Sequence, residues 1–371
     1  MAEFQPIGGK AAWTAADVPT KDAFAFDLRP RHVAALEAAA RGPVSEHRVS
    51  ERQALAPEDF DLGPIAADVA TIGAEVLHGR GMVLVRGFPI AGLGIDDIAL
   101  MYRGLGAHLG RAVSQSLMGD RLGHVLDAAR ADQHARGYRS ARELDPHTDS
   151  DDIVGLLCLR PGRSGGETLL SSAHAVHDAL LAESPRHLPL LYRGFHYHWI
   201  GEEPPGEPPV TSYRIPVFAA RDGLWSTVYL RHFIDMAFAA AGGAPDEDKA
   251  ALDAMDRVAT RADVQLRFRL EPGELILFNN YTCLHGRSAF VDDEAPGRHR
   301  HLLRLWLKAR PPRPVHDAIR RYYGEDGMPE QERGRGRYAG DTMGASPGGA
   351  NPGEASPGGA VPGGAIPGAA A

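Results

Sequence analysis

Apolar residues recur every three or four positions in several stretches of the chain, which is the spacing of one face of a helix. The run from Asp59 to Gly79 shows the pattern well, because its apolar side chains repeat at helical spacing and a glycine supplies the stop. We therefore predict a helix there. The same spacing predicts further helices over residues 31–41, 96–110, 173–181 and 246–260.

Short apolar runs predict β-strands over residues 82–88, 153–159, 167–171, 264–270, 274–278 and 302–308. Residues 153–159 are apolar without a break, which favours a buried strand. Proline and glycine at 161–166 predict a turn that pairs this strand with 167–171 as a hairpin. Residues 190–235 alternate aromatic, polar and turn residues, so several more strands with loops are expected. Short strands in series with few helices indicate a barrel or a sandwich.

Composition divides the chain into a main domain and flanking segments. We expect residues 1–60 to form an N-terminal extension packed on the core, 61–311 to form the main domain, and 312–344 to form a helical or irregular extension. Residues 345–371 repeat the pattern Ala-x-Pro-Gly-x, which cannot build a packed core and predicts a disordered tail. The polar stretch 127–145 is expected to be a covering loop.

Overall composition argues against several kinds of partner. A hydrophobic fraction of 43% and a charged fraction of 24% are typical of a soluble globular protein. The formal net charge of −8 argues against nucleic acid or an anionic membrane as a partner. No apolar run is long enough to span a bilayer, and no secretory signal is visible. Cys158 and Cys283 are too few for a zinc site or a disulfide framework, so we predict free thiols in a reducing compartment, the cytoplasm.

The stretch from Asp145 to Asp152 carries the strongest candidate chemistry. His147 and Asp149 have one residue between them, and in extended backbone such side chains leave the same face. A second imidazole, His285, follows the predicted strand 274–278 far downstream. Two histidines and one carboxylate on one face of a metal are the ligands of non-haem Fe(II) oxygenases. A His-x-Asp pair alone also arises in surface loops and helix caps, so the pair indicates a metal site only if other motifs of such a site are present.

Three further motifs follow this pair in order. Gly165-Gly166-Glu167-Thr168 comes after the metal motif, and His285 lies within Asn-Asn-Tyr-x-x-Leu-His-Gly-Arg. Arg300 and Arg304 then stand four positions apart within Arg-His-Arg-His-Leu-Leu-Arg-Leu-Trp-Leu. An arginine near a metal suits a dicarboxylate, because its planar fork binds carboxylate oxygens two at a time.

From Met82 to Lys308 these motifs resemble the TauD/TfdA family of Fe(II)- and 2-oxoglutarate-dependent oxygenases. The resemblance implies a mainly β fold with flanking helices (α+β) around a double-stranded β-helix, or jelly roll. It implies that iron is bound by His147, Asp149 and His285. 2-Oxoglutarate would chelate the iron and place its far carboxylate on Arg300 and the Thr168 hydroxyl. With O2, the co-substrate would yield succinate and CO2 while a substrate carbon is oxidised.

The same resemblance suggests the kind of substrate. Arg304 would face it and grip an acidic group, unless it is a structural arginine packed on the barrel. Arg111 and Gln115 fall where the family lines its pocket, but Arg111 replaces a histidine of the taurine enzymes, which argues against taurine itself. Because Asp149 keeps the third ligand, hydroxylation or desaturation is expected rather than halogenation. We expect a small acidic or zwitterionic substrate, in secondary metabolism, with a sulfonate-type catabolic dioxygenase as the alternative and a homo-oligomer left open.

Two other classes of protein compete with this hypothesis. Gly162-Arg163-Ser164-Gly165-Gly166 matches the Gly-x-Ser-x-Gly nucleophile elbow of α/β-hydrolases, which needs a strand before it and a helix directly after it. Residues 167–171 are instead strand-like, so this match is interpreted as chance. A non-catalytic, cupin-like binding module is the other alternative. Such a module would not need both the third ligand and the Arg300–Thr168 pair.

Overall fold

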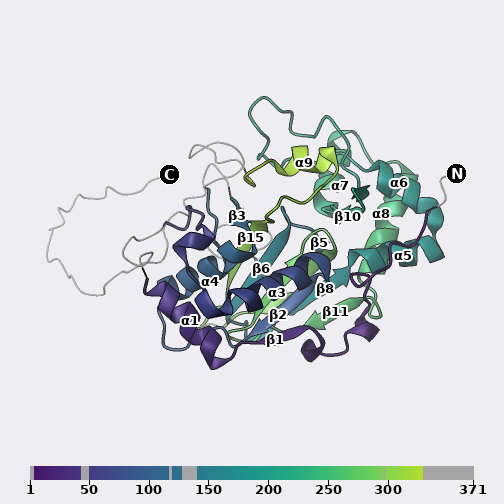
Figure 1. Cartoon of the computed structure of the whole chain (residues 1–371). Coiled ribbons are helices and arrows are strands. Elements are labelled where there is room, and N and C mark those ends of the chain that lie inside the picture. The colour runs from purple at the N-terminus through teal and green to yellow at the C-terminus, as the bar shows by residue number, and fades with distance from the viewer. Residues whose placement is uncertain are drawn as a thin grey trace, which may run out of the picture.

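The computed structural model describes residues 4–42, 50–116, 119–127, 140–293, 295 and 297–328. Two β-sheets lie at the centre of the molecule, with helices on the outer side of one sheet and at one end (Figure 1). The predicted repeat tail and most of the predicted covering loop at 127–145 lie outside the described residues. The predicted α+β fold class is confirmed.

The larger sheet has the strand order β1-β2-β12-β6-β15-β3, and β4 also pairs with β15. Its strands are β1 (Ala25–Asp27), β2 (Met82–Arg86), β3 (Arg111–Ala112), β4 (Gly123–Val125), β6 (Ile153–Arg160), β12 (Leu275–Asn279) and β15 (His301–Lys308). All of these pairs are antiparallel except β1 with β2. The smaller sheet has the order β11-β8-β13-β5 and is antiparallel. Its strands are β5 (Leu144–His147), β8 (Thr168–Ser172), β11 (Gln265–Phe268) and β13 (Cys283–Arg287).

Short ribbons and helices complete the described part of the chain. Strand β7 (Ser164–Gly165) pairs with β14 (Phe290–Val291), and β9 (Phe218–Arg221) pairs with β10 (Leu224–Thr227). The helices are α1 (Pro30–Ala40), α3 (Ala66–His78), α4 (Ile95–Leu109), α5 (Ala173–Glu183), α6 (Leu188–Arg193), α7 (Arg231–Ala240), α8 (Asp246–Ala259) and α9 (Asp317–Tyr323). None of the helices in this part of the chain has both the length and the apolar character needed to cross a bilayer.

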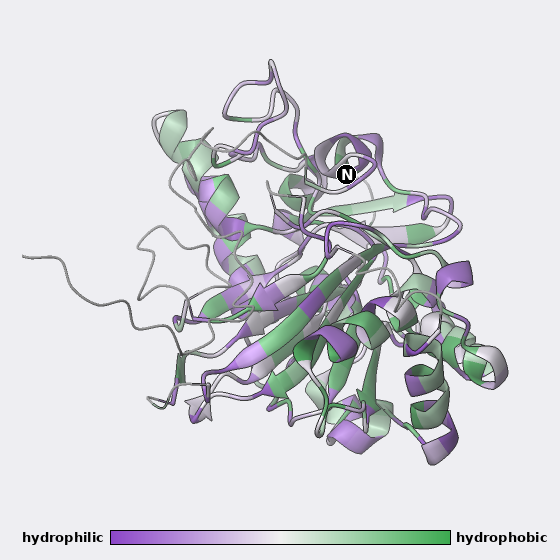
Figure 2. Cartoon of the chain, turned by 90° about the vertical axis from the view of Figure 1, so that its left-hand side faces the viewer, coloured by the Kyte–Doolittle hydropathy of each residue, from purple (hydrophilic) through white to green (hydrophobic). Residues whose placement is uncertain are grey.

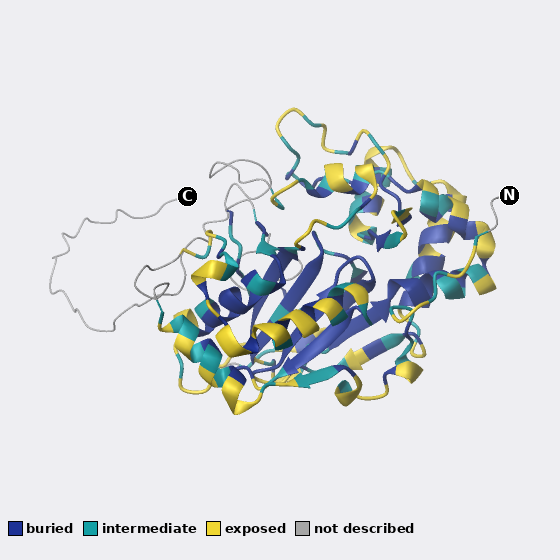
Figure 3. Cartoon of the chain, in the orientation of Figure 1, coloured by how far each residue is buried: buried dark blue, intermediate teal, exposed yellow. Residues whose placement is uncertain are grey.

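Alternation along the strands builds two separate cores. On β2, Val83 and Val85 belong to a cluster with residues of α3 and α4, whereas Met82 and Leu84 pack with residues of the smaller sheet. Both faces of the larger sheet are therefore covered, which is why its central strands β2 and β12 are buried and almost entirely apolar (Figure 3). Hydrophobic residues are correspondingly frequent along the central strands (Figure 2).

A third apolar cluster lies beyond the sheets. It joins α5, α6, α8 and the β9–β10 ribbon to α9, the last described helix. Ile319 and Tyr323 fix α9 in this cluster, since both are buried. The division into domains at 60, 311 and 344 stays a prediction, and α9 falls within the expected C-terminal extension.

The structure corrects three of the predicted elements. Strands β6 and β8 do not form a hairpin: β6 pairs with β12 and β15, whereas β8 pairs with β11 and β13, so the turn between them carries the chain from one sheet to the other. Helix α3 begins at Ala66 rather than Asp59, after short 3-10 turns around Pro64. Residues 190–235 contain less strand than predicted, and α7 was missed.

Candidate active site

Two imidazoles far apart in the sequence meet through strand register. Antiparallel pairing of β13 with β5 sets His285 directly opposite His147, with ring centroids 4.2 Å apart. Asp149 follows β5 and turns back to the same point. Candidate ligand atoms of the three residues all lie within 4.8 Å of one another. The sequence predicted this convergence, and the geometry agrees with it.

His147 is held in the form that a metal requires. Its Nδ1–H donates a hydrogen bond of 2.8 Å to the Asp145 carbonyl, which leaves the lone pair of Nε2 facing the other two residues. Burial lowers the pKa of His147 to about 4, and the adjacent His285 adds to the effect. The imidazole is therefore neutral near pH 7, so a metal need not displace a proton from it.

Asp149 supplies the negative charge of the group. Its Oδ1 lies 3.8 Å from His147 Nε2, and its Oδ2 lies 3.4 Å from His285 Nε2. Burial alone would raise the pKa of Asp149, but the Arg304 charge and the His285 hydrogen bond outweigh it and hold the pKa well below its usual range. The carboxylate is thus ionised and ready to bind a cation.

The loop that carries Asp149 is fixed by hydrogen bonds from other elements. The Asn280 amide accepts from Asp149 N–H at 2.8 Å and donates to the carbonyls of Asp149 and Asp151. Thr148 N–H donates to the Tyr229 carbonyl at 2.9 Å, and Tyr229 N–H donates to the Thr148 hydroxyl at 3.0 Å. These contacts stabilise a tight turn in which Asp151 has a φ of 68°.

Strand β15 holds the Asp149 carboxylate from the other sheet. Trp306 donates its indole N–H to Oδ2 at 2.8 Å, and Arg304 Nη1 donates to the same oxygen at 3.2 Å. Gln115 accepts from Arg304 Nε at 2.8 Å and donates to the Arg304 carbonyl, so it orients the arginine. Arg304 therefore reaches the candidate metal site, and Gln115 acts on it through Arg304.

A buried cationic region adjoins the three ligands. Thr168 on β8 faces Arg287 on β13 across the smaller sheet, and Arg300 is only 4% exposed. The guanidinium groups of Arg287 and Arg300 both lie over the Phe290 ring, 4.8 and 5.1 Å from its centroid. Burial lowers the pKa of each arginine to about 10, so both remain charged at neutral pH. Within the described ranges, Arg300 Nη1 is buried without a hydrogen-bond partner.

These residues fit iron and a dicarboxylate. Two imidazoles and one carboxylate are the donor set of mononuclear Fe(II) sites, and donors on one side leave the other positions for further ligands. A buried guanidinium N–H without a partner costs free energy, which a carboxylate would offset by accepting from it. Thr168 and Arg300, both predicted for 2-oxoglutarate, are buried in this part of the molecule.

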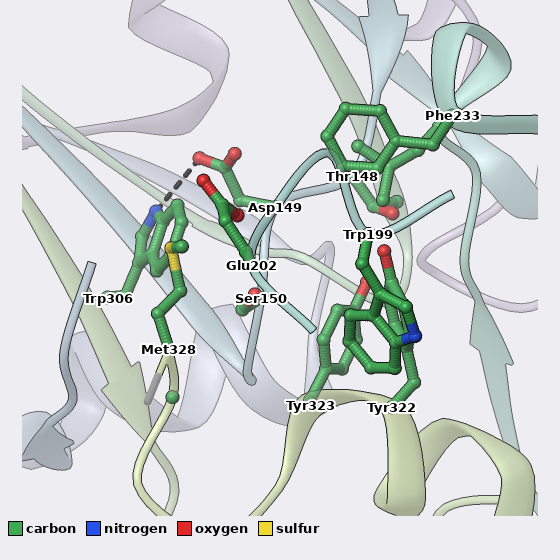
Figure 4. Close-up of a pocket in the computed structure, with 12 residues that line it drawn as sticks. Thr148, Asp149, Ser150, Trp199, Glu202, Phe233, Trp306, Tyr322, Tyr323 and Met328 are labelled. Atoms are coloured by element: carbon green, nitrogen blue, oxygen red, sulfur yellow. Dashed lines mark hydrogen bonds between the residues drawn. The ribbon is translucent and has the colours of Figure 1, made fainter. Parts of the chain in front are cut away.

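A cavity of about 120 Å³ opens beside Asp149. Its lining comes from the metal loop, from β15, from the loop at 199–202 and from the C-terminal residues around α9 (Figure 4). The lining residues are Thr148, Asp149, Ser150, Trp199, Glu202, Leu230, Phe233, Trp306, Tyr322, Tyr323, Gly327 and Met328. The C-terminal extension thus forms one wall of the candidate substrate site.

Arg111, a predicted substrate residue, has a different position. Its guanidinium binds the Asp326 carboxylate and the Glu325 carbonyl, and it is not among the residues that line the cavity. Arg121 binds the same Asp326 carboxylate at 2.6 Å. Both arginines therefore fasten the segment that carries Met328, a lining residue. The role of Arg111 in contacting substrate stays a prediction, and this position does not favour it.

Several residues of the site were missed by sequence reasoning. Trp306 could have been found, because it stands two positions after Arg304 on a strand and so shares its face. Arg287 stands in the same way two positions after His285. Its Nη2 donates to the Ser140 carbonyl at 2.6 Å and to the Arg142 carbonyl, which links the cationic region to the approach of β5. Glu202 gave no signal, since it lies in an irregular loop.

The competing hydrolase motif lacks its structural context. Ser164 lies on β7, and strand β8 follows rather than a helix. Ser164 is also exposed and belongs to a ribbon that pairs with β14, so no nucleophile elbow is formed.

The paired sheets with two histidines and one aspartate on a shared face define the class of Fe(II)- and 2-oxoglutarate-dependent oxygenases. Residues 46–306 match the family described as "Taurine catabolism dioxygenase TauD, TfdA family", and the chain belongs to this family. Its cofactors are Fe(II) and 2-oxoglutarate. The resemblance drawn from the motifs is therefore confirmed.

Two curated relatives resemble much of the chain. FR-33289 synthase of Streptomyces rubellomurinus is 34% identical over 316 residues, which cover 82% of this chain and 90% of the relative. The taurine hydroxylase-like protein SAT17 of Stachybotrys chartarum is 26% identical over 265 residues, covering 68% of this chain and 67% of the relative.

Solved structures show the same fold. A complex of asparagine oxygenase with Fe(II), 2S,3S-3-hydroxyasparagine and succinate has a TM-score of 0.62 at 17% identity, covering 83% of this chain and 99% of that one. The non-heme iron oxygenase OrfP, in complex with Fe and alpha-ketoglutaric acid, has a TM-score of 0.54 at 15% identity, covering 76% and 93%. The predicted double-stranded β-helix is thereby confirmed.

Proposed function

We propose that this protein hydroxylates or desaturates a C–H bond of a small acidic or zwitterionic molecule, with 2-oxoglutarate converted to succinate and CO2. The observation that carries the proposal is the meeting of His147, Asp149 and His285 at a cavity whose wall includes Asp149. A substrate in that cavity would lie beside the metal.

Each ligand and co-substrate residue has a distinct role in this proposal. His147, Asp149 and His285 hold Fe(II), and the bound iron supplies the oxidation of a C–H bond by O2. Arg300 donates to the far carboxylate of 2-oxoglutarate through its buried guanidinium, and Thr168 adds its hydroxyl. Apolar side chains around these groups, such as Phe290, exclude water and strengthen the ionic contact.

The residues around Asp149 also bear on which substrate is bound. Arg304 is not itself among the cavity-lining residues, but it lies against two of them, Asp149 and Trp306, so its positive charge would favour an acidic group in a substrate bound beside them. Asp149 occupies the position of the third ligand, which favours hydroxylation or desaturation over halogenation. The relative named FR-33289 synthase supports a biosynthetic role, whereas the family description and the relative named as taurine hydroxylase-like support a sulfonate-type catabolic dioxygenase as the alternative. The two free thiols support a reducing, cytoplasmic setting.

Anaerobic spectroscopy tests the proposal directly. Protein with Fe(II) should develop a weak visible charge-transfer band when 2-oxoglutarate is added, because the co-substrate chelates the metal. His147→Ala and Asp149→Ala should lose this band and the iron-dependent release of succinate. His124→Ala is a matched control, since His124 lies on β4 with its Nδ1 2.9 Å from His301 Nε2 and is not one of the three grouped ligands. A cupin-like binding module would bind the metal yet stay colourless when 2-oxoglutarate is added.

A further inference from the structure

The cavity beside Asp149 has a distinctive chemical lining. Asp149 and Glu202 are its charged side chains among the described lining residues, and both are acidic. Trp199, Tyr322, Tyr323, Phe233 and Trp306 provide aromatic surface. A carboxylate among aromatic faces is the usual surrounding for a positively charged nitrogen, because the ring quadrupoles and the carboxylate both attract a cation.

Glu202 is positioned to contribute its charge inside the cavity. Glu202 is only 9% exposed. Its backbone N–H donates a hydrogen bond of 3.0 Å to the Trp199 carbonyl, which holds these two lining residues together. Figure 4 shows the Glu202 side chain directed toward Asp149, on the side of the cavity that Trp306 also lines. A carboxylate in this position would repel an anionic group from that part of the cavity.

The aromatic residues form a connected surface. The rings of Trp199 and Tyr322 lie with centroids 4.7 Å apart, and those of Tyr322 and Tyr323 lie 5.2 Å apart. Tyr322 also packs on Tyr197, which is fully buried. These contacts hold the ring faces in place before a ligand arrives, so little conformational entropy is lost when it binds.

We propose that the cavity binds the cationic nitrogen group of a zwitterionic substrate, with Glu202 as its carboxylate partner and Trp199 and Tyr322 as its aromatic walls. The inference rests on the proposed oxygenase function and narrows its substrate class. Because the Glu202 side chain is directed toward Asp149, the bound nitrogen group would lie near the candidate metal ligands.

Matched pairs of small molecules test the inference without turnover. The full-length protein is loaded with Fe(II) and 2-oxoglutarate under anaerobic conditions and titrated by calorimetry. The probes are β-alanine, taurine, 2-aminoethylphosphonate and L-lysine, each compared with its N-acetyl derivative (the Nε-acetyl derivative for lysine). We expect at least one amine to bind about tenfold or more tightly than its acetylated counterpart, since a charge-assisted hydrogen bond to Glu202 is lost on acetylation.

Two variants assign that preference to a residue. Glu202→Gln should remove the difference between amine and acetylated probe. Glu203→Gln makes the same change of charge one position along the chain, at a residue that does not line the cavity, and should keep the difference. Each variant is accepted only if it still gives the charge-transfer band with 2-oxoglutarate, which shows that the metal site is folded.

The outcomes separate this inference from the proposed function. If the wild-type protein shows no charge-transfer band, the oxygenase proposal itself fails. If the band forms but no amine binds more tightly than its acetylated counterpart, or if Glu203→Gln removes the preference as fully as Glu202→Gln, the cation site is overturned and the oxygenase proposal stands.

Discussion

The indole N–H of Trp306 donates to Oδ2 of Asp149 at 2.8 Å, from a strand of the opposite sheet. Because this contact joins the two sheets at the candidate metal ligand, Trp306 fixes the direction in which the carboxylate points. Hydrogen bonds to a ligating carboxylate are part of a metal site, and their loss commonly weakens metal binding.

Replacing Trp306 with Phe should therefore weaken Fe(II) binding by about 10- to 100-fold, with the fold retained. The ring remains to pack against Arg304, so the change isolates the hydrogen bond. Metal titration under anaerobic conditions measures the affinity. Trp225→Phe serves as the control, because Trp225 lies on the β9–β10 ribbon. Equal affinities in the Trp306→Phe and wild-type proteins would show that Asp149 does not depend on the indole.

Arg300 and Arg304 should have separable effects on kinetics. Arg300→Ala should raise the 2-oxoglutarate requirement by about 10- to 150-fold, because one charge-assisted carboxylate contact contributes roughly 1.5–3 kcal/mol. Arg304→Ala should act on the requirements for substrate and for Fe(II), because Arg304 donates to Asp149 Oδ2, so both variants are compared at saturating Fe(II). Succinate release measured against each concentration distinguishes the two. A large change in the 2-oxoglutarate requirement with Arg304→Ala alone would make Arg304 the better anchor for the co-substrate.

Asp326 should couple Arg111 to the substrate cavity. Asp326→Asn and Arg111→Ala are each expected to raise the substrate KM by about two- to fivefold, because a partly exposed ion pair contributes up to about 1 kcal/mol. The double variant should be little worse than Asp326→Asn alone, since that change already removes the Arg111 contact together with the Arg121 contact. Additive effects would instead indicate that Arg111 contacts substrate by itself. Steady-state kinetics at saturating 2-oxoglutarate measures all three variants.

The stability of the metal-free protein should fall in weak acid because of His174. Burial lowers the pKa of this imidazole from its ordinary value of 6.5 to about 4. Between these two values the unfolded chain binds a proton that the folded chain does not, so the free energy of unfolding decreases as the pH falls. From pH 7 to pH 5 the loss should be on the order of 2 kcal/mol.

Urea unfolding of wild-type and His174→Phe proteins across this pH range measures the effect. The variant removes the titrating group, so its free energy of unfolding should vary less with pH, whatever its absolute stability. Parallel pH profiles for the two proteins would show that His174 does not contribute. Both proteins are measured with a chelator present, because bound metal would add its own pH dependence.

The three candidate metal ligands could be predicted because residue type and short sequence spacing indicate metal binding. His147 and Asp149 are neighbours in the sequence, and only their meeting with His285 needed the fold. That meeting depends on the register of β13 with β5, which alternating apolar positions constrain but do not determine. The family motifs supplied the missing long-range information.

The pairing of β6 and the position of Arg111 could not be predicted, because both depend on contacts between residues far apart in the sequence. The turn at 161–166 predicted a hairpin, yet the strands on either side enter different sheets, because β6 is covered on both faces within the larger sheet. Arg111 lies in the predicted pocket region by position along the chain, but its partner Asp326 is far away in the sequence. Long-range ion pairs of this kind leave no local pattern to detect.

The direct facing of His147 and His285 also has a mechanical consequence. In the described part of the chain, β5 is the outermost strand of the smaller sheet and is hydrogen bonded to β13 alone. A metal ion bound by both imidazoles would link β5 to β13 in addition to their backbone hydrogen bonds. Bound iron would then stabilise the edge of the smaller sheet as well as supply redox chemistry. Removing it should allow β5 to separate from β13 before the larger sheet, which α3 and α4 cover, unfolds.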